Sequence, residues 1–200
     1  DFNLNTVHSR MTVRVVHGET DHVRPHRQTP FETLTMAERD IGVDLPRIVP
    51  TTTGDSGFVA PGDDGATHWV RLLTYVEGEI MRTVRPRTPS LLESFGEAIG
   101  RLDAALSEFD HPAAVRPDFQ WDLTRAHQVM DANLSHIRKK ERGARVEAVR
   151  HEFETVVVPL LPDVPRSVIH NDANDYNVLV SPPTPEGQTV VGLVDFGDAL

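Results

Sequence analysis

The chain of 200 residues contains no cysteine. Disulfide bonds and thiolate catalysis are therefore excluded, and the composition fits a cytoplasmic protein. No apolar run has the length of a membrane span, and the first residues lack the pattern of a signal peptide. We therefore expect a protein that has no membrane partner.

Positive charge is also scarce. Lysine and arginine number 20 against 30 aspartates and glutamates, which gives a formal net charge of −10. Nucleic acid is excluded as a general partner, because a phosphate backbone needs a basic surface. The only lysines are Lys139 and Lys140. The ten histidines are scattered and do not form the close pairs that metal sites use.

Two motifs stand in order near the end of the chain. His170, Asp172 and Asn177 form H-x-D-x-x-x-x-N, and Asp195-Phe196-Gly197 follows the apolar run 190–194. Phosphoryl transfer from Mg-ATP needs one carboxylate that takes the proton of the acceptor hydroxyl or orients it. It also needs an amide and a second carboxylate that hold the metal ions. The spacing predicts Asp172 for the first role, and Asn177 with Asp195 for the second.

Each motif alone is weak, because Asp and Gly are common turn residues and Phe is an ordinary core residue. Their ordered combination is far more specific and indicates a kinase. For His170 we expect a structural role, in which the ring packs and hydrogen-bonds the loop that presents Asp172. Asn174 suits a turn. Asp175 and Asp198 stay open between orienting the loop or the ammonium group of an acceptor and capping a turn.

The order of predicted elements is strands, then helices, then a catalytic hairpin. Ser90, with Glu93 three residues later, is the expected N-cap of the first long helix, in a capping box. The chain begins without methionine and stops five residues after Asp195, so we expect a fragment cut at both ends. Apolar periodicity and turn residues predict strands at 11–16, 68–76, 168–169, 178–180 and 190–194, and helices at 31–38, 91–109, 123–138 and 144–160.

Residues 167–197 resemble the catalytic core of the aminoglycoside phosphotransferase and choline kinase superfamily, relatives of the protein kinases. The hydroxylysine kinase branch is the closer match, through 168–180, 191–198, 45–50 and 72–78. That branch includes modules fused ahead of a class III aminotransferase-like domain. The resemblance implies an α+β, protein-kinase-like bilobal fold with a small β-rich N-lobe and a mainly helical C-lobe.

Under this resemblance, residues 1–76 form a partial nucleotide-binding lobe and residues 77–200 a partial catalytic lobe. Asp172 becomes the catalytic base, and Asn177 and Asp195 become the magnesium ligands. Thr74, Tyr75 and Val76 become the inter-lobe hinge, whose backbone would hydrogen-bond the adenine edge. The alternative for these three residues is the end of a core strand.

The chain departs from the family at the lysine that holds the ATP phosphates. Arg14 stands at the matching position, in the run 12–16, and no lysine precedes Lys139. Arginine keeps the charge and binds phosphate bidentately, but its planar fork has a different shape. A solvent-facing arginine on an edge strand is the alternative. The family pairs this cation with a helix glutamate; Gln28 sits nearest that position, with Glu32 four residues later, and the choice between them stays open.

The function predicted from these residues is transfer of the γ-phosphate of ATP, with Mg²⁺, to a hydroxyl of an amine-bearing metabolite such as hydroxylysine. The expected partner is a small, cationic hydroxyl acceptor, with a downstream aminotransferase-like domain as a second expectation. The missing lysine favours an alternative, which is a non-catalytic nucleotide-binding module. A regulatory kinase-like segment of a larger multidomain protein is the other alternative.

Overall fold

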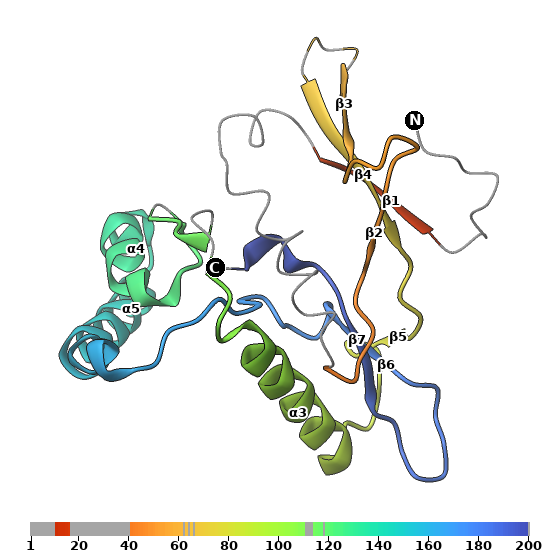
Figure 1. Ribbon diagram of the computed structural model, residues 1–200. Coiled ribbons are helices and arrows are strands. Elements are labelled where there is room, and N and C mark those ends of the chain that lie inside the picture. The colour runs from red at the N-terminus through yellow and green to blue at the C-terminus, as the bar shows by residue number, and fades with distance from the viewer. Residues whose placement is uncertain are drawn as a thin grey trace. The chain divides into compact units, whose positions relative to one another are not determined.

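The computed structural model describes residues 11–16, 41–61, 63, 65, 67–110, 114–117 and 119–199, with the backbone alone for 11–16 and 67–69 (Figure 1). The chain divides into two compact units, Asp1–Val115 with Ser167–Leu200, and Arg116–Arg166. We call them unit 1 and unit 2. The predicted helix at 31–38 and the two candidate partners of Arg14, Gln28 and Glu32, lie outside the described residues.

The first sheet of unit 1 is antiparallel and centred on β4. Strand β1 (Met11–Val16) pairs along one edge of β4 (Thr67–Thr74), while β2 (Ile48–Val49) and β3 (Phe58–Pro61) also pair with β4. The strand predicted at 11–16 is confirmed, and the one predicted at 68–76 ends at Thr74. Leu72 and Leu73 are both buried. Since successive side chains point to opposite faces, the core covers both faces of this part of β4.

The second sheet carries the two motif segments. Its order is β5 (Glu79–Ile80), β6 (Val178–Val180) and β7 (Val190–Leu193), all antiparallel. The strand predicted at 178–180 is confirmed, and the one predicted at 190–194 ends one residue early. The strand predicted at 168–169 is wrong: these residues are in no strand, and Val168 is buried by packing alone. An apolar residue can be buried without hydrogen bonding to a neighbouring strand.

Two glycines allow the second sheet to approach the segment that follows β4. A Cβ on Gly192 would lie 2.5 Å from Cγ1 of Val76, and a Cβ on Gly78 would lie 2.8 Å from Cβ of Leu179. Gly78 also has a φ of 149°, which side chains rarely adopt. The chain therefore needs glycine at both positions to bring residues 76–78 against β6 and β7.

One long helix, α3 (Pro89–Leu106), packs its apolar stripe into the core of unit 1. Its buried residues recur at helical spacing, which agrees with the helix predicted at 91–109. The predicted N-cap was wrong. Thr88 caps the helix through Oγ1, which accepts from the N–H of Leu91, and Pro89 occupies the first turn. Proline suits that position because its missing N–H would have no helical partner there. The buried positions of α3 are Leu91, Ala98, Leu102 and Leu106.

Unit 2 is helical. The helix predicted at 123–138 is split into η4 (Leu123–Arg125), α4 (Ala126–Asn133) and η5 (Leu134–His136). The helix predicted at 144–160 begins earlier, as α5 (Lys140–Glu152), and continues as η6 (Phe153–Val157) and η7 (Val158–Asp163).

The change of helix type towards the end of unit 2 has a local cause. Pro159 has no N–H to donate to the carbonyl of Thr155, which favours the change from η6 to η7 at Val158. Arg150 of α5 forms ion pairs with Asp131 of α4 at 3.3 Å and with Glu154 at 3.0 Å. These contacts join α4, α5 and η6. Across the described residues, no helix combines the length and apolarity that a membrane crossing needs.

Candidate active site

The loop between residues 170 and 177 is held by a buried histidine. His170 is 2% exposed, and its Nε2 lies 3.0 Å from the carbonyl oxygen of Val194. Its Nδ1 accepts from the N–H of Asp172 at 3.3 Å, so Nε2 carries the proton. The ring also packs on Phe196, with 4.4 Å between centroids. His170 thus ties the Asp172 loop to the Asp195-Phe196-Gly197 segment, which agrees with the structural role expected for it.

The charge state of His170 fits this position. Burial lowers the pKa of the imidazole below its ordinary value, although the carbonyl of Val194 and the nearby carboxylates of Asp172 and Asp195 act in the opposite direction. A neutral imidazole accepts at Nδ1, as the hydrogen bond from Asp172 requires. Both motif carboxylates therefore lie within electrostatic reach of one buried ring.

The Asp172 carboxylate is fixed by two amides. Asn174 donates from Nδ2 to Oδ1 at 2.7 Å, and Asn177 donates from Nδ2 to Oδ2 at 2.9 Å. Asn177 also donates to the backbone carbonyl of Asp172 at 2.9 Å. Asn171 just before it has a φ of 62°, which asparagine tolerates better than most residues. The loop therefore presents Asp172 in one orientation.

Asn174 does more than the turn role predicted for it. Its Oδ1 accepts from the N–H of Tyr176 at 2.8 Å, and its own N–H donates to the carbonyl of Asp172 at 2.8 Å. These two contacts form the turn, and the Nδ2 contact orients the carboxylate. An asparagine two residues after Asp172 was the one sequence feature that could have indicated this contact with the carboxylate. The same Asp-x-Asn pattern occurs in ordinary turns, so it did not distinguish the two roles.

The predicted metal ligands stand on neighbouring segments. The N–H of Val194 donates to the carbonyl of Asn177 at 2.9 Å, which places Asp195 one residue beyond that contact. Nδ2 of Asn177 faces Asp172, and among the described residues its Oδ1 has no hydrogen-bond partner. Asp195 is the N-cap of η8 (Phe196–Asp198) and has a φ of 64°.

This donor set fits a magnesium ion that is completed by substrate. Mg²⁺ prefers oxygen ligands and is commonly held by one or two protein groups together with phosphate oxygens. In the described part of the chain, no three His, Asp or Glu side chains gather as a closed metal site. An amide oxygen from Asn177 and a carboxylate from Asp195 would hold such an ion only with phosphate or water oxygens beside them.

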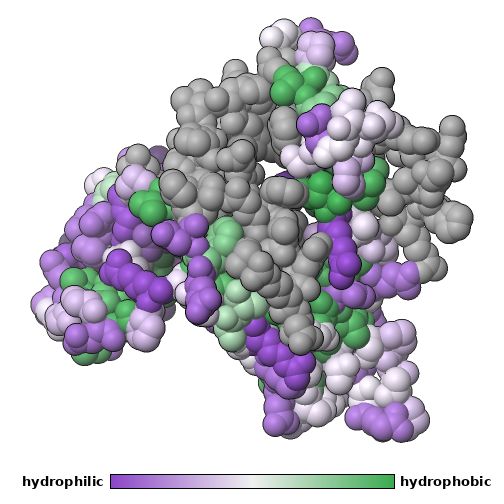
Figure 2. Space-filling view, viewed as in Figure 1, coloured by the Kyte–Doolittle hydropathy of each residue, from purple (hydrophilic) through white to green (hydrophobic). Residues whose placement is uncertain are grey.

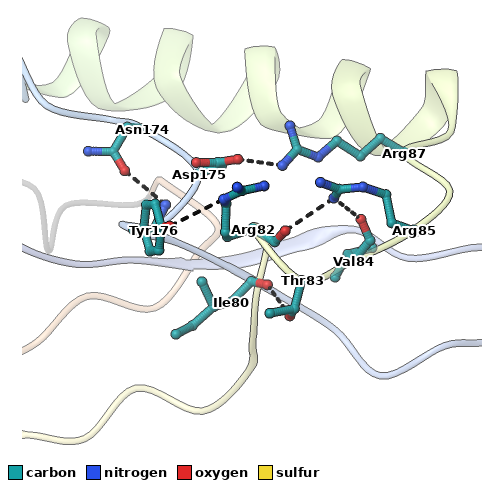
Figure 3. A network of polar contacts seen from close by, with 9 residues as sticks. All are labelled: Ile80, Arg82, Thr83, Val84, Arg85, Arg87, Asn174, Asp175 and Tyr176. Atoms are coloured by element: carbon teal, nitrogen blue, oxygen red, sulfur yellow. Dashed lines mark hydrogen bonds and ion pairs between the residues drawn. The ribbon is translucent and has the colours of Figure 1, made fainter.

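A polar network joins the loop to the segment before α3 (Figure 3). The carboxylate of Asp175 forms an ion pair with Arg87, and its carbonyl accepts from the N–H of Arg82 at 2.8 Å. Nε of Arg82 donates to the hydroxyl of Tyr176 at 3.3 Å. The sequence left the role of Asp175 open, and the structure shows its carboxylate paired with Arg87. The network connects the loop that carries Asp172 to the start of α3.

Replacing Arg87 with alanine is expected to loosen this loop. Amide hydrogen exchange over 171–177 should become about two- to fivefold faster, because one side of a partly exposed ion pair is lost. Arg85→Ala is the matched control, since Arg85 donates only to the nearby carbonyls of Arg82 and Val84. Equal exchange in both variants would remove Arg87 from the support of the loop.

The same pair gives a pH dependence. The hydrogen bond and charge of Arg87 hold the pKa of Asp175 below its ordinary value. A carboxyl with a depressed folded pKa stabilises the fold above its unfolded pKa, and that stability is lost as the pH falls through the folded pKa. The difference in melting temperature between wild type and Arg87→Ala should therefore shrink below about pH 4.

Two of the three predicted hinge residues have backbone groups without a partner in the described part of the chain. Thr74 is the last residue of β4, and its N–H donates to the carbonyl of Arg47 at 2.8 Å. Tyr75 is 53% exposed and Val76 is 7% exposed, and their backbone groups have no hydrogen-bond partner among the described residues. Since a buried N–H is seldom left unpaired, the edge of Val76 suits a ligand. Thr74 is the member of the three whose N–H is already used.

Arg14 lies on β1, and its Cα is the register partner of Arg71 on β4. For Arg14 the structure describes the backbone alone, so its predicted contact with phosphate stays a prediction. Arg71 is 8% exposed. The sequence did not single out this buried arginine.

The fold is shared with solved structures of small-molecule kinases. The chain superimposes with a TM-score of 0.62 on the amicoumacin kinase hAmiN, solved in complex with AMP-PNP, Ca²⁺ and Ami, at 12% identity over 94% of this chain and 52% of that one. With the microcompartment-associated aminopropanol kinase the TM-score is 0.58, at 20% identity over 96% of this chain and 59% of that one. The predicted α+β, protein-kinase-like fold is confirmed.

The chain belongs to the phosphotransferase enzyme family, which matches residues 2–200. It is 30% identical to the hydroxylysine kinase of Danio rerio over 169 residues, which cover 78% of this chain and 45% of that protein. It is 32% identical to the hydroxylysine kinase of Xenopus laevis over 176 residues, which again cover 78% of this chain and 45% of that protein. The chain therefore spans less than half the length of these relatives.

Proposed function

We propose that the protein is an ATP-dependent kinase that phosphorylates a hydroxyl group of a small, amine-bearing metabolite. A hydroxylated amino acid such as hydroxylysine is the first candidate acceptor. Three relatives that bear the name hydroxylysine kinase, at 30–32% identity, support this choice of acceptor. Membership of the phosphotransferase family supports the reaction class. A cytoplasmic location and a downstream aminotransferase-like domain stay predictions.

The observation that carries the proposal is the orientation of the Asp172 loop. Two amides hold both oxygens of the Asp172 carboxylate, and one of them, Asn177, turns its own oxygen away from that contact. A carboxylate fixed in this way accepts the proton of an acceptor hydroxyl without first reorganising. Positioning of this kind is the main task of a protein in phosphoryl transfer, because the chain contributes little covalent chemistry.

The reaction then follows from these roles. The acceptor oxygen forms a bond to the γ-phosphorus while the bond from that phosphorus to the β,γ-bridging oxygen breaks, and ADP leaves. The hydroxyl proton passes to the carboxylate of Asp172. Asn177 and Asp195 would hold Mg²⁺, which supplies charge neutralisation on the phosphate oxygens. The backbone of Tyr75 and Val76 would bind the adenine edge, and Arg14 would bind phosphate in place of the usual lysine.

The test is ATP consumption by the full-length protein against a panel of hydroxylated amines. The panel contains hydroxylysine, choline, ethanolamine, homoserine and an aminoglycoside, each measured with Mg²⁺ and with EDTA. We expect Mg²⁺-dependent turnover with one class of acceptor, and hydroxylysine as the best substrate. Turnover that is equal with and without an acceptor would contradict a kinase for small amines.

Arg14 favours a second candidate, a nucleotide-binding module without turnover. A guanidinium in place of the usual ammonium binds phosphate but places it differently, because the fork is planar and longer. Mg²⁺-dependent ATP binding, combined with no consumption for any acceptor in the panel, would favour this second function. Restored turnover in Arg14→Lys would then locate the cause.

A further inference from the structure

Unit 2 contains a basic groove that the proposed reaction does not use. It lies where η5 meets the start of α5 and has a volume of about 650 Å³. The lining includes four side chains that are cationic at neutral pH, Arg138, Lys139, Arg142 and Arg145. The groove is formed by residues 136–146 alone, so it belongs entirely to unit 2.

The side chains of these four cations have no counter-charge in the described part of the chain. They make no hydrogen bond or ion pair there, although acidic residues are frequent in this chain. Arg150, further along the same helix, shows the contrast, because it pairs with both Asp131 and Glu154. Hydrophilic side chains gather over α4 and α5 in Figure 2. Like charges brought together around one cavity repel each other, and an anion between them removes that repulsion.

The rest of the lining is partly apolar. Ile137 and Val146 are half-buried and give the groove an apolar part, while His136 adds a further donor. A volume of this size lies within the range of small-molecule sites, about 300–1,000 Å³. Three of the four cations are arginines, whose fork matches the oxygen pairs of phosphate.

The start of α5 adds to the positive potential. Lys139 is the N-cap of this 13-residue helix, and its side chain makes no capping hydrogen bond. The N–H groups of the first turn of a helix lack helical acceptors and favour a nearby anion.

We propose that this groove binds a small anion with two or more phosphate groups. A diphosphate or triphosphate carries several negative charges near neutral pH, which complement the four cations of the lining. The lining of the groove shares no residue with the Asp172 loop: the groove lies in unit 2 and the loop in unit 1. The groove is therefore proposed as a second anion site.

The experiment titrates inorganic tripolyphosphate into the protein by calorimetry, at low salt and with EDTA present. EDTA removes the metal-dependent contribution of the Asp172 site, and the Asp195→Asn variant checks that this removal is complete. The test variant is Arg142→Ala with Arg145→Ala. The matched control is Lys140→Ala with Arg166→Ala, which removes the same charge from unit 2 outside the lining.

We expect the test variant to bind tripolyphosphate about tenfold or more weakly, and the control to stay within about twofold of wild type. Bound tripolyphosphate should slow amide exchange over residues 136–146. An equal loss of tripolyphosphate affinity in both double variants would show that binding depends only on the total positive charge of the protein, and it would overturn the proposal. Tighter binding of an acidic peptide than of tripolyphosphate would also overturn it, in favour of a protein partner.

Discussion

Replacing Asp172 with alanine is expected to abolish acceptor-dependent phosphate transfer by the full-length protein. Loss of a positioned general base commonly costs about 10²–10⁴-fold in rate. The carboxylate is held by Asn174 and Asn177, and no other described carboxylate accepts from both amides. The rate constant for turnover should fall while the affinity for ATP changes little, because Asp172 is proposed to contact the acceptor and not the nucleotide.

The fold should survive this change. Without the carboxylate, Nδ2 of Asn177 loses one of its two acceptors but keeps its hydrogen bond to the backbone carbonyl of residue 172, so this contact still closes the loop. Circular dichroism and melting temperature measure this directly. Asn174→Ala is the milder variant for comparison, since it removes one of the two amides that hold the carboxylate and leaves Asp172 itself in place. Turnover within about tenfold of wild type in Asp172→Ala would remove Asp172 from the chemistry.

The sequence predicted the loop because the information there is local. His170, Asp172 and Asn177 lie within eight positions, and the spacing of a loop that returns on itself sets their contacts. The strand at 178–180 follows for the same reason. The predicted strand at 168–169 failed because Val168 is buried without pairing to a neighbouring strand and Ile169 is 40% exposed.

Contacts between distant segments were beyond the sequence. Arg87 and Asp175 are 88 positions apart, and nothing in the residues around either one indicates the other. The capping of α3 was missed for a different reason. Both Thr88 and Ser90 are good caps, and the choice between them depends on where Pro89 enters the first turn.

The second large effect is expected at Asp195, and the choice of variant decides whether it is interpretable. Asp195 has a φ of 64°, a left-handed conformation that costs about 1–2 kcal/mol for most residues but less for Asp and Asn. Alanine would therefore add backbone strain to the loss of the carboxylate. Asparagine keeps the shape and the backbone preference and removes the charge alone, so Asp195→Asn isolates the role of the carboxylate.

We expect Asp195→Asn to need more Mg²⁺ for ATP binding and to lose about 10²–10³-fold in turnover, because one proposed ligand of the metal is lost. The measurement is ATP affinity across a magnesium titration, with the melting temperature as the check on folding. Asp110→Asn removes the same charge from an exposed position of unit 1 and serves as the control. If both variants follow the wild-type magnesium curve, Asp195 does not bind the metal, and Asn177 would have to hold it without a carboxylate from this segment.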